Sequence, residues 1–442
     1  MKPAFLKRFF AMLLAGTLIL SLAGCAGNQN TSQDSGSSDS SESDSDVIEL
    51  TFWYSFGGAT QEANETLTQQ FNDTIGKEKG IHVTAEYQGS YNETATKLQA
   101  AAVAGTMPDV SVVGTTSMGI FLENGQLEPL NTYVERDLDT SDFFPGLLKN
   151  TVKDDTWYGV PYLCSTPILY LNTTLLEQAG LDPAGPKTWE EMAEYCKTIH
   201  DKLGIYGLST YSYEWFLEAF MLEHGITMLN EDETACNLDT PEVQEIMQYF
   251  KDLEEAGYIH WAPSADEGSG HITADYTNQN CAMWFNSTSG LTTVLQVADE
   301  NNFEVNTCFI PAEETYGVPI GGSSLVMFNT VPDEKKEAAW EFIKYMTDTE
   351  QTAYASKTTG YVPLRASAEE TETLQELYGQ YPQYKVALDQ LRDYSTGRPL
   401  NPNYVECTYE IMAAMDAIMV NDADIATTLA ETAQKVDTIL NQ

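Results

Sequence analysis

Short runs typical of β-strands alternate with longer runs of helical periodicity along most of this chain. Residues 47–54 are rich in β-branched and aromatic side chains and predict a strand, and residues 60–75 repeat apolar residues at helical spacing. Further strands are predicted at 81–87, 109–113 and 167–172, and further helices at 93–104, from Thr188 onward, and at 240–256, 333–346 and 423–440. Strands and helices of modest length in alternation predict an α/β fold, with helices covering the faces of a sheet.

The first 24 residues have the composition of a secretory signal. Three basic residues precede an apolar run, from about residue 9 to residue 22, that is too short to span a membrane comfortably. The run ends in Leu22-Ala23-Gly24-Cys25, which resembles a bacterial lipobox. This resemblance implies a signal peptide at residues 1–24 and a lipid anchor, palmitate included, on Cys25. The alternative is an ordinary signal peptide with a chance cysteine at its end.

The segment that follows, at residues 25–47, is strongly hydrophilic. Eight Ser and five acidic residues lie between residues 26 and 47, with almost no apolar side chain. Such a segment cannot bury enough apolar surface to offset the entropy cost of ordering, so we expect a disordered tether. Residues 48–442 are enough for two domains of ordinary size. They contain no other apolar run long enough to cross a bilayer, so Cys25 is the one membrane attachment that we expect.

Acidic residues dominate the charge of the chain. With 66 Asp and Glu against 22 Lys and Arg, the formal net charge is −44. A chain this acidic repels nucleic acid and anionic lipid, so we expect neither as a partner. The same charge disfavours an anionic ligand, although a local cluster of Arg or Lys could override it.

The cysteines and histidines form no metal or disulfide pattern. Beyond Cys25, six cysteines are scattered along the chain without a Cys-x-x-Cys motif, and the five histidines include no pair at i,i+4. Several of these cysteines lie in apolar strings, where a thiol packs as a small core group. We expect free buried thiols, no metal site and no cofactor.

A series of short motifs follows in order along residues 48–442. The motifs are Leu50-Thr51-Phe52-Trp53, Ala104-Gly105-Thr106-Met107-Pro108-Asp109-Val110, Tyr158-Gly159-Val160-Pro161-Tyr162, Leu169-Tyr170-Leu171-Asn172, Gly180-Leu181-Asp182-Pro183, Pro186-Lys187-Thr188-Trp189, Cys281-Ala282-Met283, Gly321-Gly322-Ser323 and Thr359-Gly360-Tyr361-Val362-Pro363. In this order they resemble the extracellular solute-binding proteins, family 1, of ABC importers, which bind sugars or, in one branch, glycerol 3-phosphate.

The resemblance implies a two-lobe α/β fold of the periplasmic-binding-protein type (type II), with hinge strands between lobes that close on a ligand. We assign residues 48–164 plus 315–355 to one lobe and residues 165–314 plus 356–442 to the other. The resemblance further implies that the protein is a monomer and not an enzyme. It also implies that the protein delivers a captured sugar to permease subunits driven by a cytoplasmic ATPase. We expect it on the extracellular face of the cell membrane, in a Gram-positive-type bacterium.

Similarity to the glycerol-phosphate branch implies ligand contacts at Tyr91, Ser165, Ser287, Gly322 and Tyr361. Three of them have a structural alternative: packing at a helix start for Tyr91, a cap for Ser165, and a turn with positive φ for Gly322. A sugar presents apolar C–H faces and a ring of hydroxyls, which aromatic platforms and short polar groups bind. The platform candidates, for which core packing is the alternative, are Trp53, Trp215 and Trp284.

Two positions depart from that branch. Thr115 stands where the branch has an acidic contact, and Glu406 and Cys407 fall near the place of its late phosphate-binding Arg. Arg398, a few residues earlier, could supply the missing cation. We therefore expect a neutral mono- or oligosaccharide, with sn-glycerol 3-phosphate or a glycerophosphodiester as the alternative. A secreted glycoside hydrolase, the rival from another class, needs two carboxylates at one sugar bond, and no motif points to such a pair.

Overall fold

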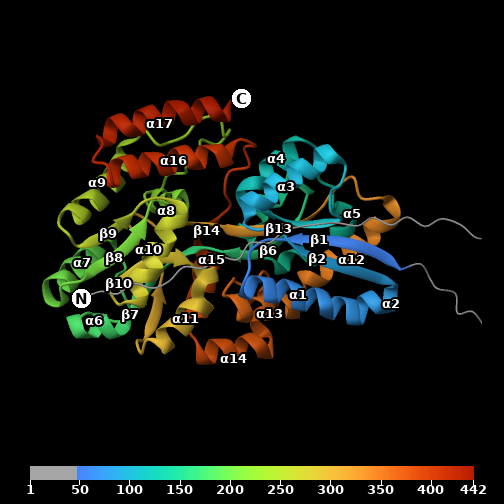
Figure 1. Cartoon of the computed structure of the whole chain (residues 1–442), viewed down its shortest axis with the longest axis horizontal. Coiled ribbons are helices and arrows are strands. Elements are labelled where there is room, and N and C mark those ends of the chain that lie inside the picture. Colours follow the sequence, from blue (N-terminus) through green and yellow to red (C-terminus); the bar gives the residue numbers. More distant parts are fainter. Residues whose placement is uncertain (1–46) are drawn as a thin grey trace, which may run out of the picture. The chain divides into compact units, whose positions relative to one another are not determined.

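Two five-stranded sheets organise the residues that the structure describes (Figure 1). The structure, a computed structural model, describes residues 47–442, apart from the side chains of residues 265–267. The expected signal peptide at 1–24, the lipid anchor on Cys25 and nearly all of the expected tether at 25–47 lie outside the described residues.

The first sheet has the strand order β2-β1-β3-β13-β6. Strand β1 runs parallel to β2 and β3, whereas β13 runs antiparallel to β3 and β6. The strands are β1 (Ile48–Tyr54), β2 (Ile81–Tyr87), β3 (Val110–Gly114), β6 (Val160–Ser165) and β13 (Gly321–Met327). Strands β3 and β6 are buried along their whole length, as expected for strands covered on both faces.

The second sheet has the strand order β11-β7-β10-β8-β9. Strand β8 is parallel to β9 and β10, and β7 is antiparallel to β10 and β11. The strands are β7 (Pro167–Asn172), β8 (Tyr206–Tyr211), β9 (Ile259–Ala262), β10 (Cys281–Ser287) and β11 (Val305–Cys308).

The chain passes between the two sheets at closely spaced points. Only Thr166 separates the end of β6 in the first sheet from the start of β7 in the second. The return passes through β12 (Val318–Pro319), which pairs with β14 (Ser395–Thr396) just before β13 begins. A separate hairpin is formed by β4 (Val152–Lys153) and β5 (Thr156–Trp157). Several connections side by side are the arrangement that a hinge requires.

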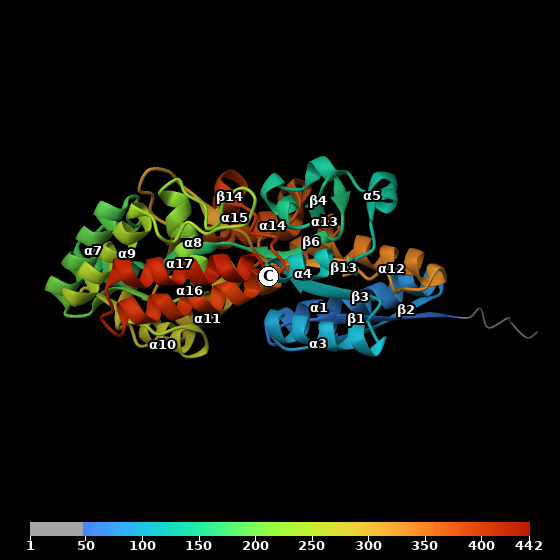
Figure 2. The same ribbon diagram turned by 90° about the horizontal axis from the view of Figure 1, so that it is seen from above.

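Helices cover both sheets (Figures 1 and 2). Those that pack around the first sheet are α1 (Ala59–Phe71), α2 (Lys77–Lys79), α3 (Tyr91–Ala104), α4 (Met118–Glu123), α5 (Asn131–Asp137), α12 (Asp333–Met346) and α13 (Thr349–Thr359). Those around the second are α6 (Thr173–Ala179), α7 (Trp189–Leu203), α8 (Glu214–Glu223), α9 (Pro241–Glu255), α10 (Ala265–Thr277) and α11 (Leu291–Glu300). The last four are α14 (Glu372–Gln380), α15 (Gln383–Tyr394), α16 (Tyr404–Met419) and α17 (Ile425–Leu440), of which α16 and α17 pack on each other and on α9.

Most expected elements are confirmed within two residues of their predicted ends. Strands β2 and β7 and helix α12 have the predicted bounds, and Thr188 caps α7 by accepting from the Glu191 N–H. Helix α3 begins two residues earlier than expected, at Tyr91, and α17 two residues later, because Ser90 and Asp424 are the capping residues. The helix expected at residues 60–75 ends as α1 at Phe71 and continues as a wider π-helical turn, Asn72–Gly76.

The six cysteines between residues 47 and 442 are all free. Cys164, Cys196, Cys281 and Cys407 are buried, and the other two are partly buried, so the expectation of free thiols is confirmed for this part of the chain. No cluster of His, Cys, Asp and Glu among the described side chains is arranged to hold a metal ion. Of the helices within residues 47–442, none combines the length and the hydropathy needed to cross a membrane.

Candidate functional site

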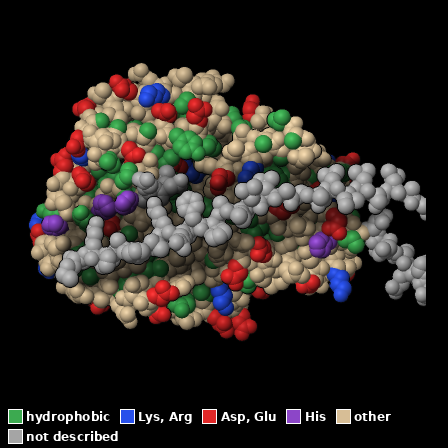
Figure 3. Space-filling model, in the orientation of Figure 1, with side chains coloured by type: hydrophobic (Ala, Val, Ile, Leu, Met, Phe, Trp, Pro, Cys, Tyr) green, Lys and Arg blue, Asp and Glu red, His purple; other side chains and the backbone are tan. Residues whose placement is uncertain are grey.

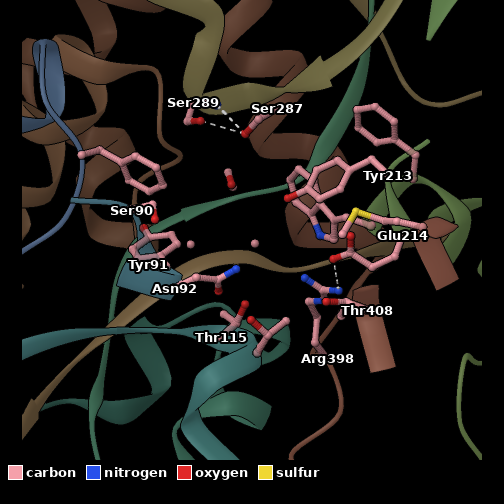
Figure 4. A pocket seen from close by; sticks show the side chains of 18 of the residues that line it. Ser90, Tyr91, Asn92, Thr115, Tyr213, Glu214, Ser287, Ser289, Arg398 and Thr408 are labelled. Atoms are coloured by element: carbon pink, nitrogen blue, oxygen red, sulfur yellow. Dashed lines mark hydrogen bonds and ion pairs between the residues drawn. The ribbon is translucent and has the colours of Figure 1, made fainter. Parts of the chain in front are cut away.

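A cavity of about 710 Å³ lies between segments that belong to the two sheets. From the first sheet its walls are the loop after β1, the start of α3 after β2 and the turn after β3; from the second they are the segments after β8 and β10. Helix α16 adds a further wall, and Figure 4 shows the labelled side chains converging on this space. Open α/β sheets bind ligands beyond the carboxyl ends of their strands, so this cavity is the candidate site.

All eight residues expected to bind ligand line this one cavity. They come from strands, helix starts and loops that are far apart in the sequence: Tyr91, Thr115, Ser165, Trp215, Ser287, Gly322, Tyr361 and Arg398. The fold therefore brings together the five residues that the family resemblance selected and the three that were chosen on chemical grounds, Thr115, Trp215 and Arg398. Their contact with a ligand remains a prediction.

A capping box holds the start of α3 against the cavity. The Ser90 hydroxyl accepts from the Glu93 N–H at 3.3 Å, and the Glu93 carboxylate accepts from the Ser90 N–H at 2.7 Å. Tyr91 follows directly; its ring meets that of Phe56 edge-on at 4.7 Å, and its hydroxyl lies 3.4 Å from that of Tyr361. Burial raises the pKa of both tyrosines, so each offers a neutral hydroxyl that can donate and accept.

A β-bulge brings the backbone of β13 to the cavity wall. The pairing register with β6 shifts between Gly321 and Ser323. Gly322 has a φ of 101°, and a Cβ atom there would lie 2.1 Å from the carbonyl oxygen of Leu163. A Cβ atom on Gly321 would lie 2.4 Å from the indole ring of Trp215. Gly322 therefore has the positive φ that was considered as its structural role, and it also lines the cavity.

The second sheet contributes aromatic rings and short hydroxyl side chains. Tyr211 and Tyr213 stack with their ring centroids 5.5 Å apart, and both line the cavity beside Trp215. After β10, the hydroxyl oxygens of Ser287 and Ser289 lie 2.8 Å apart. This wall therefore combines apolar faces with groups that can donate and accept hydrogen bonds.

Arg398 is neutralised by two buried carboxylates of α8. Its guanidinium donates to Glu214 Oε1 at 3.0 Å and to Glu218 Oε1 at 3.0 Å, and its Nε lies 2.9 Å from Glu218 Oε2. The hydroxyl of Tyr404 also donates to Glu218. Burial raises the pKa of Glu214, and the positive charge of Arg398 opposes this rise. Arg398 is therefore committed to internal partners and is poorly placed to hold an anionic ligand.

The charge around the cavity is low for a chain this acidic. Among the described residues that line it, only Glu93, Glu214 and Arg398 are charged. Acidic side chains, by contrast, are spread over the visible surface outside the grey atoms (Figure 3). The site is therefore a mainly neutral, hydroxyl-rich and aromatic space.

A sequence profile of a known family covers most of the chain. The family described as "bacterial extracellular solute-binding protein" matches residues 66–384. The chain belongs to this family. The family expected from the sequence motifs is thereby confirmed.

Relatives and solved structures agree with this assignment. The sn-glycerol-3-phosphate-binding periplasmic protein UgpB of Brucella abortus is 27% identical over 352 residues, which are 76% of this chain and 78% of the relative. The structure of UgpB from Mycobacterium tuberculosis in complex with glycerophosphocholine has a TM-score of 0.77 at 24% identity, covering 89% of this chain and 98% of its own. A cyclic α-maltosyl-1,6-maltose binding protein from Arthrobacter globiformis has a TM-score of 0.75 at 23% identity, covering 89% and 99%. The two-lobe α/β fold expected for this solute-binding protein is confirmed.

Several positions considered from the sequence lie outside the cavity of this solute-binding protein. Trp284 is fully buried and stacks between Tyr170 and Tyr276, so its expected alternative, core packing, is correct. Trp53, on the inner strand β1, donates its indole N–H at 2.8 Å to Glu86 on the edge strand β2, and it does not line the cavity. Of the three platform candidates, Trp215 alone lines the site.

Helix α16 does not place Glu406 or Cys407, the residues near the position of the branch's phosphate-binding Arg, at the cavity. Cys407 is buried, with its thiol directed at the carbonyl of Val436 in α17, and neither Cys407 nor Glu406 lines the site. The next two residues, Thr408 and Tyr409, do so. A helix turns by about 100° per residue, so an alignment error of one or two positions changes which side chain faces a ligand.

Eight of the 23 residues that line the cavity were predicted as ligand contacts, so sequence reasoning missed most of its wall. Lining residues that were not predicted include Phe56, Asn92, Tyr211, Tyr213, Glu214, Phe216, Ser289, Thr408, Tyr409 and Met412. Those after β8 carried a usable signal, because the dense aromatic run at residues 211–216 follows directly on a strand. Asn92 and Tyr409 carried none, because each is one polar or aromatic residue on an exposed helix surface.

Proposed function

We propose that this protein is the substrate-binding lipoprotein of an ABC importer and captures a neutral mono- or oligosaccharide in the cavity between its two sheets. The observation that carries this proposal is the chemistry of the cavity wall, where aromatic rings alternate with neutral hydroxyl and amide side chains. Aromatic faces bind the C–H surfaces of a sugar ring, and short polar groups bind its hydroxyls.

The position of the cavity supports capture by closure. Tyr91 and Thr115 approach from the first sheet, and Trp215 and Ser287 from the second. A ligand that touches both sides stabilises the closed state relative to the open state, which is the condition for ligand-driven closure. We propose lobes of residues 48–164 plus 315–355 and of residues 165–314 plus 356–442, and a working unit that is a monomer.

A phosphate-bearing ligand is the second candidate, because the curated relatives reported above are named for sn-glycerol 3-phosphate. Within the described cavity wall, Arg398 is the one cation, and Glu214 and Glu218 already neutralise it. An anion there would lack the charge-assisted partner that such ligands need. The balance of charge therefore favours a neutral sugar over sn-glycerol 3-phosphate or a glycerophosphodiester.

A glycoside hydrolase is less compatible with the same wall. The two lining carboxylates are Glu93, which serves the capping box of α3, and Glu214, which pairs with Arg398. A hydrolase needs a free acid and a free base or nucleophile on either side of one bond. We therefore propose binding without turnover.

A ligand panel tests the proposed function. The full-length protein is titrated calorimetrically with D-glucose, maltose, maltotriose, sn-glycerol 3-phosphate and glycerophosphocholine. We expect saturable binding of at least one neutral sugar with no change in the sugar. Binding confined to the two phosphate compounds would contradict the neutral-sugar proposal, and hydrolysis of any sugar would contradict the binding-protein proposal.

The membrane anchor is a separate part of the proposal and rests on the lipobox at residues 22–25. A lipid on Cys25 would hold the protein on the extracellular face of the membrane, beside a permease that accepts the sugar. We expect the wild type in the membrane fraction of its cell and the Cys25→Ser variant in the medium. Equal distribution of the two proteins would contradict lipidation.

A further inference from the structure

Two buried polar atoms that belong to residues lining the cavity have no hydrogen-bond partner among the described residues. They are Oε2 of Glu214 and Nε1 of Trp215, which belong to consecutive residues at the start of α8. Each of these two residues is only 4% exposed, and both line the cavity. Buried polar groups are normally hydrogen-bonded, because burying one without a partner removes its hydrogen bonds to water without replacement. An unpaired acceptor and an unpaired donor on consecutive cavity-lining residues point to a bound molecule that completes both.

The other carboxylate oxygen of Glu214, Oε1, is held in place by Arg398. Oε1 accepts from Arg398 at 3.0 Å, and Arg398 is itself held by Glu218 and by the side chain of Asn150, which accepts from the Arg398 N–H at 3.0 Å. Figure 4 shows the Glu214 carboxylate between Arg398 and the aromatic group that includes Tyr213. This network restrains the carboxylate through Oε1, whereas Oε2 has no hydrogen-bond partner among the described residues.

We propose that Glu214 accepts a hydrogen bond from a ligand hydroxyl through Oε2, that Trp215 donates from Nε1 to a neighbouring ligand oxygen, and that Arg398 is a positioning residue rather than a ligand contact. The inference rests on the proposed function, because it names the part of a sugar that the cavity recognises. The chemical class that fits is a polyol or pyranose with a free hydroxyl next to a second oxygen. A ligand phosphate at the same place would face a carboxylate and be repelled.

This assignment gives Arg398 a different role from the one expected from the sequence. The sequence suggested a substitute cation for an anionic ligand, whereas the guanidinium here orients an acceptor for a neutral one. A hydrogen bond between a ligand hydroxyl and a carboxylate is among the stronger protein–ligand contacts, so one residue can contribute much of the selectivity.

To test the inference, the sugar affinity of Glu214→Gln is compared with that of a matched control, Glu223→Gln, both in full-length protein. Glu223 lies on the same helix, is fully buried, accepts from the Trp189 indole N–H at 3.0 Å and also has one unpartnered oxygen, but it does not line the cavity. Calorimetric titrations use D-glucose, maltose, maltotriose and sn-glycerol 3-phosphate, and thermal unfolding reports stability.

We expect Glu214→Gln to weaken binding of the preferred neutral sugar by about tenfold to a hundredfold, the loss typical of a hydrogen bond to a charged group. Glu223→Gln should leave that affinity within about twofold, and Trp215→Phe, which keeps a ring but removes the N–H, should weaken it severalfold. Equal affinities for wild type and Glu214→Gln would overturn the inference while leaving the proposed function intact. Wild-type binding of sn-glycerol 3-phosphate alone would overturn both.

Discussion

Gly322 shows how one residue connects the hinge strands to the cavity. Its φ of 101° lies in a region that side chains disfavour, and its backbone approaches Leu163 too closely for any Cβ atom. Leu163 itself has a positive φ of 49° while being 4% exposed. Backbone strain of this kind persists only where the surrounding structure enforces it, and it clusters at functional sites.

Replacing Gly322 by Ala should therefore destabilise the protein and disturb the cavity together. We expect a loss of about 2–4 kcal/mol of unfolding free energy, because a positive φ and a contact of 2.1 Å with the Leu163 carbonyl oxygen must both be relieved. Urea unfolding measures the loss. The control is Gly379→Ala in α14, where an added Cβ meets no atom within 4 Å and should slightly stabilise the helix. Similar stabilities for the two variants would contradict this account of the bulge.

His260 and Asp275 form a pair outside the cavity whose effect on stability depends on pH. The hydrogen bond to Asp275 raises the pKa of His260 from its ordinary 6.5, against the effect of partial burial. Burial would raise the pKa of Asp275, but hydrogen bonds from His260 and Ser209 outweigh it and lower that pKa below 3.8. The His260 contribution is thus complete below pH 6.5 and is lost as the pH rises through its higher folded pKa. The Asp275 contribution is present above 3.8 and is lost as the pH falls through its lower folded pKa.

The variant His260→Gln tests the direction in which the stabilising contribution of His260 changes with pH. The difference in unfolding free energy between wild type and variant should be larger at about pH 6 than at about pH 9, because the imidazole is neutral in both states at the higher pH. Chemical denaturation at the two pH values measures it. A difference that grows towards pH 9 would contradict the assignment.

Among the elements, α3 carries a local signal for its start that the prediction at residue 93 did not use. Ser90 and Glu93 stand in the spacing of a capping box, a short-range signal that moves the helix start to Tyr91. The same kind of signal at Thr188 and at Thr240 with Pro241 correctly predicted the starts of α7 and α9. Helix starts depend on residues three or four positions apart, so sequence alone can locate them.

Replacing Ser90 by Ala should affect both stability and binding. We expect a loss of about 1 kcal/mol of unfolding free energy, the usual effect of removing a cap, together with weaker sugar binding because α3 carries Tyr91 and Asn92 into the cavity. Thr188→Ala removes a comparable cap from α7, which does not reach the cavity, and should cost similar stability without changing affinity. Calorimetry and urea unfolding on both variants measure the two effects. Equal affinities in the two variants would show that the α3 cap does not position the site.

At the scale of the whole described unit, side chains from helices beside the two sheets meet directly at the cavity. The amide of Asn92 at the start of α3 donates to the hydroxyl of Tyr409 on α16 at 2.9 Å. This contact joins an element of the first sheet to a helix that packs on the second-sheet elements α8 and α9. It favours the closed arrangement by the net value of one exposed hydrogen bond, about 0.5–1.5 kcal/mol.

Tyr409→Phe should therefore shift the ligand-free protein towards an open arrangement. A loss of about 1 kcal/mol changes the ratio of closed to open molecules about fivefold, so we expect a larger radius of gyration in small-angle X-ray scattering and a modestly weaker sugar affinity. Tyr381→Phe is the control, because the Tyr381 hydroxyl bonds only the neighbouring Gln380 side chain at 3.2 Å. An unchanged radius in Tyr409→Phe would mean that the Asn92 contact does not influence closure.

The sequence by itself determined the α/β class, the positions of most strands and helices, and eight residues of the cavity wall, five of them selected by resemblance. These depend on periodicity, on caps and on motifs, which are all readable over short stretches of chain. Tertiary structure alone decided the hydrogen-bond partners and the burial of those side chains. Arg398 and Glu214 are 184 positions apart, and only their packing turned an apparent anion-binding cation into an internal counter-ion. Likewise, Trp215 lines the cavity and Trp284 is buried in the core, although both lie in segments of the sequence that are rich in apolar residues. Which face of an element meets solvent, ligand or core depends on contacts between distant segments, and short-range sequence patterns do not contain that information.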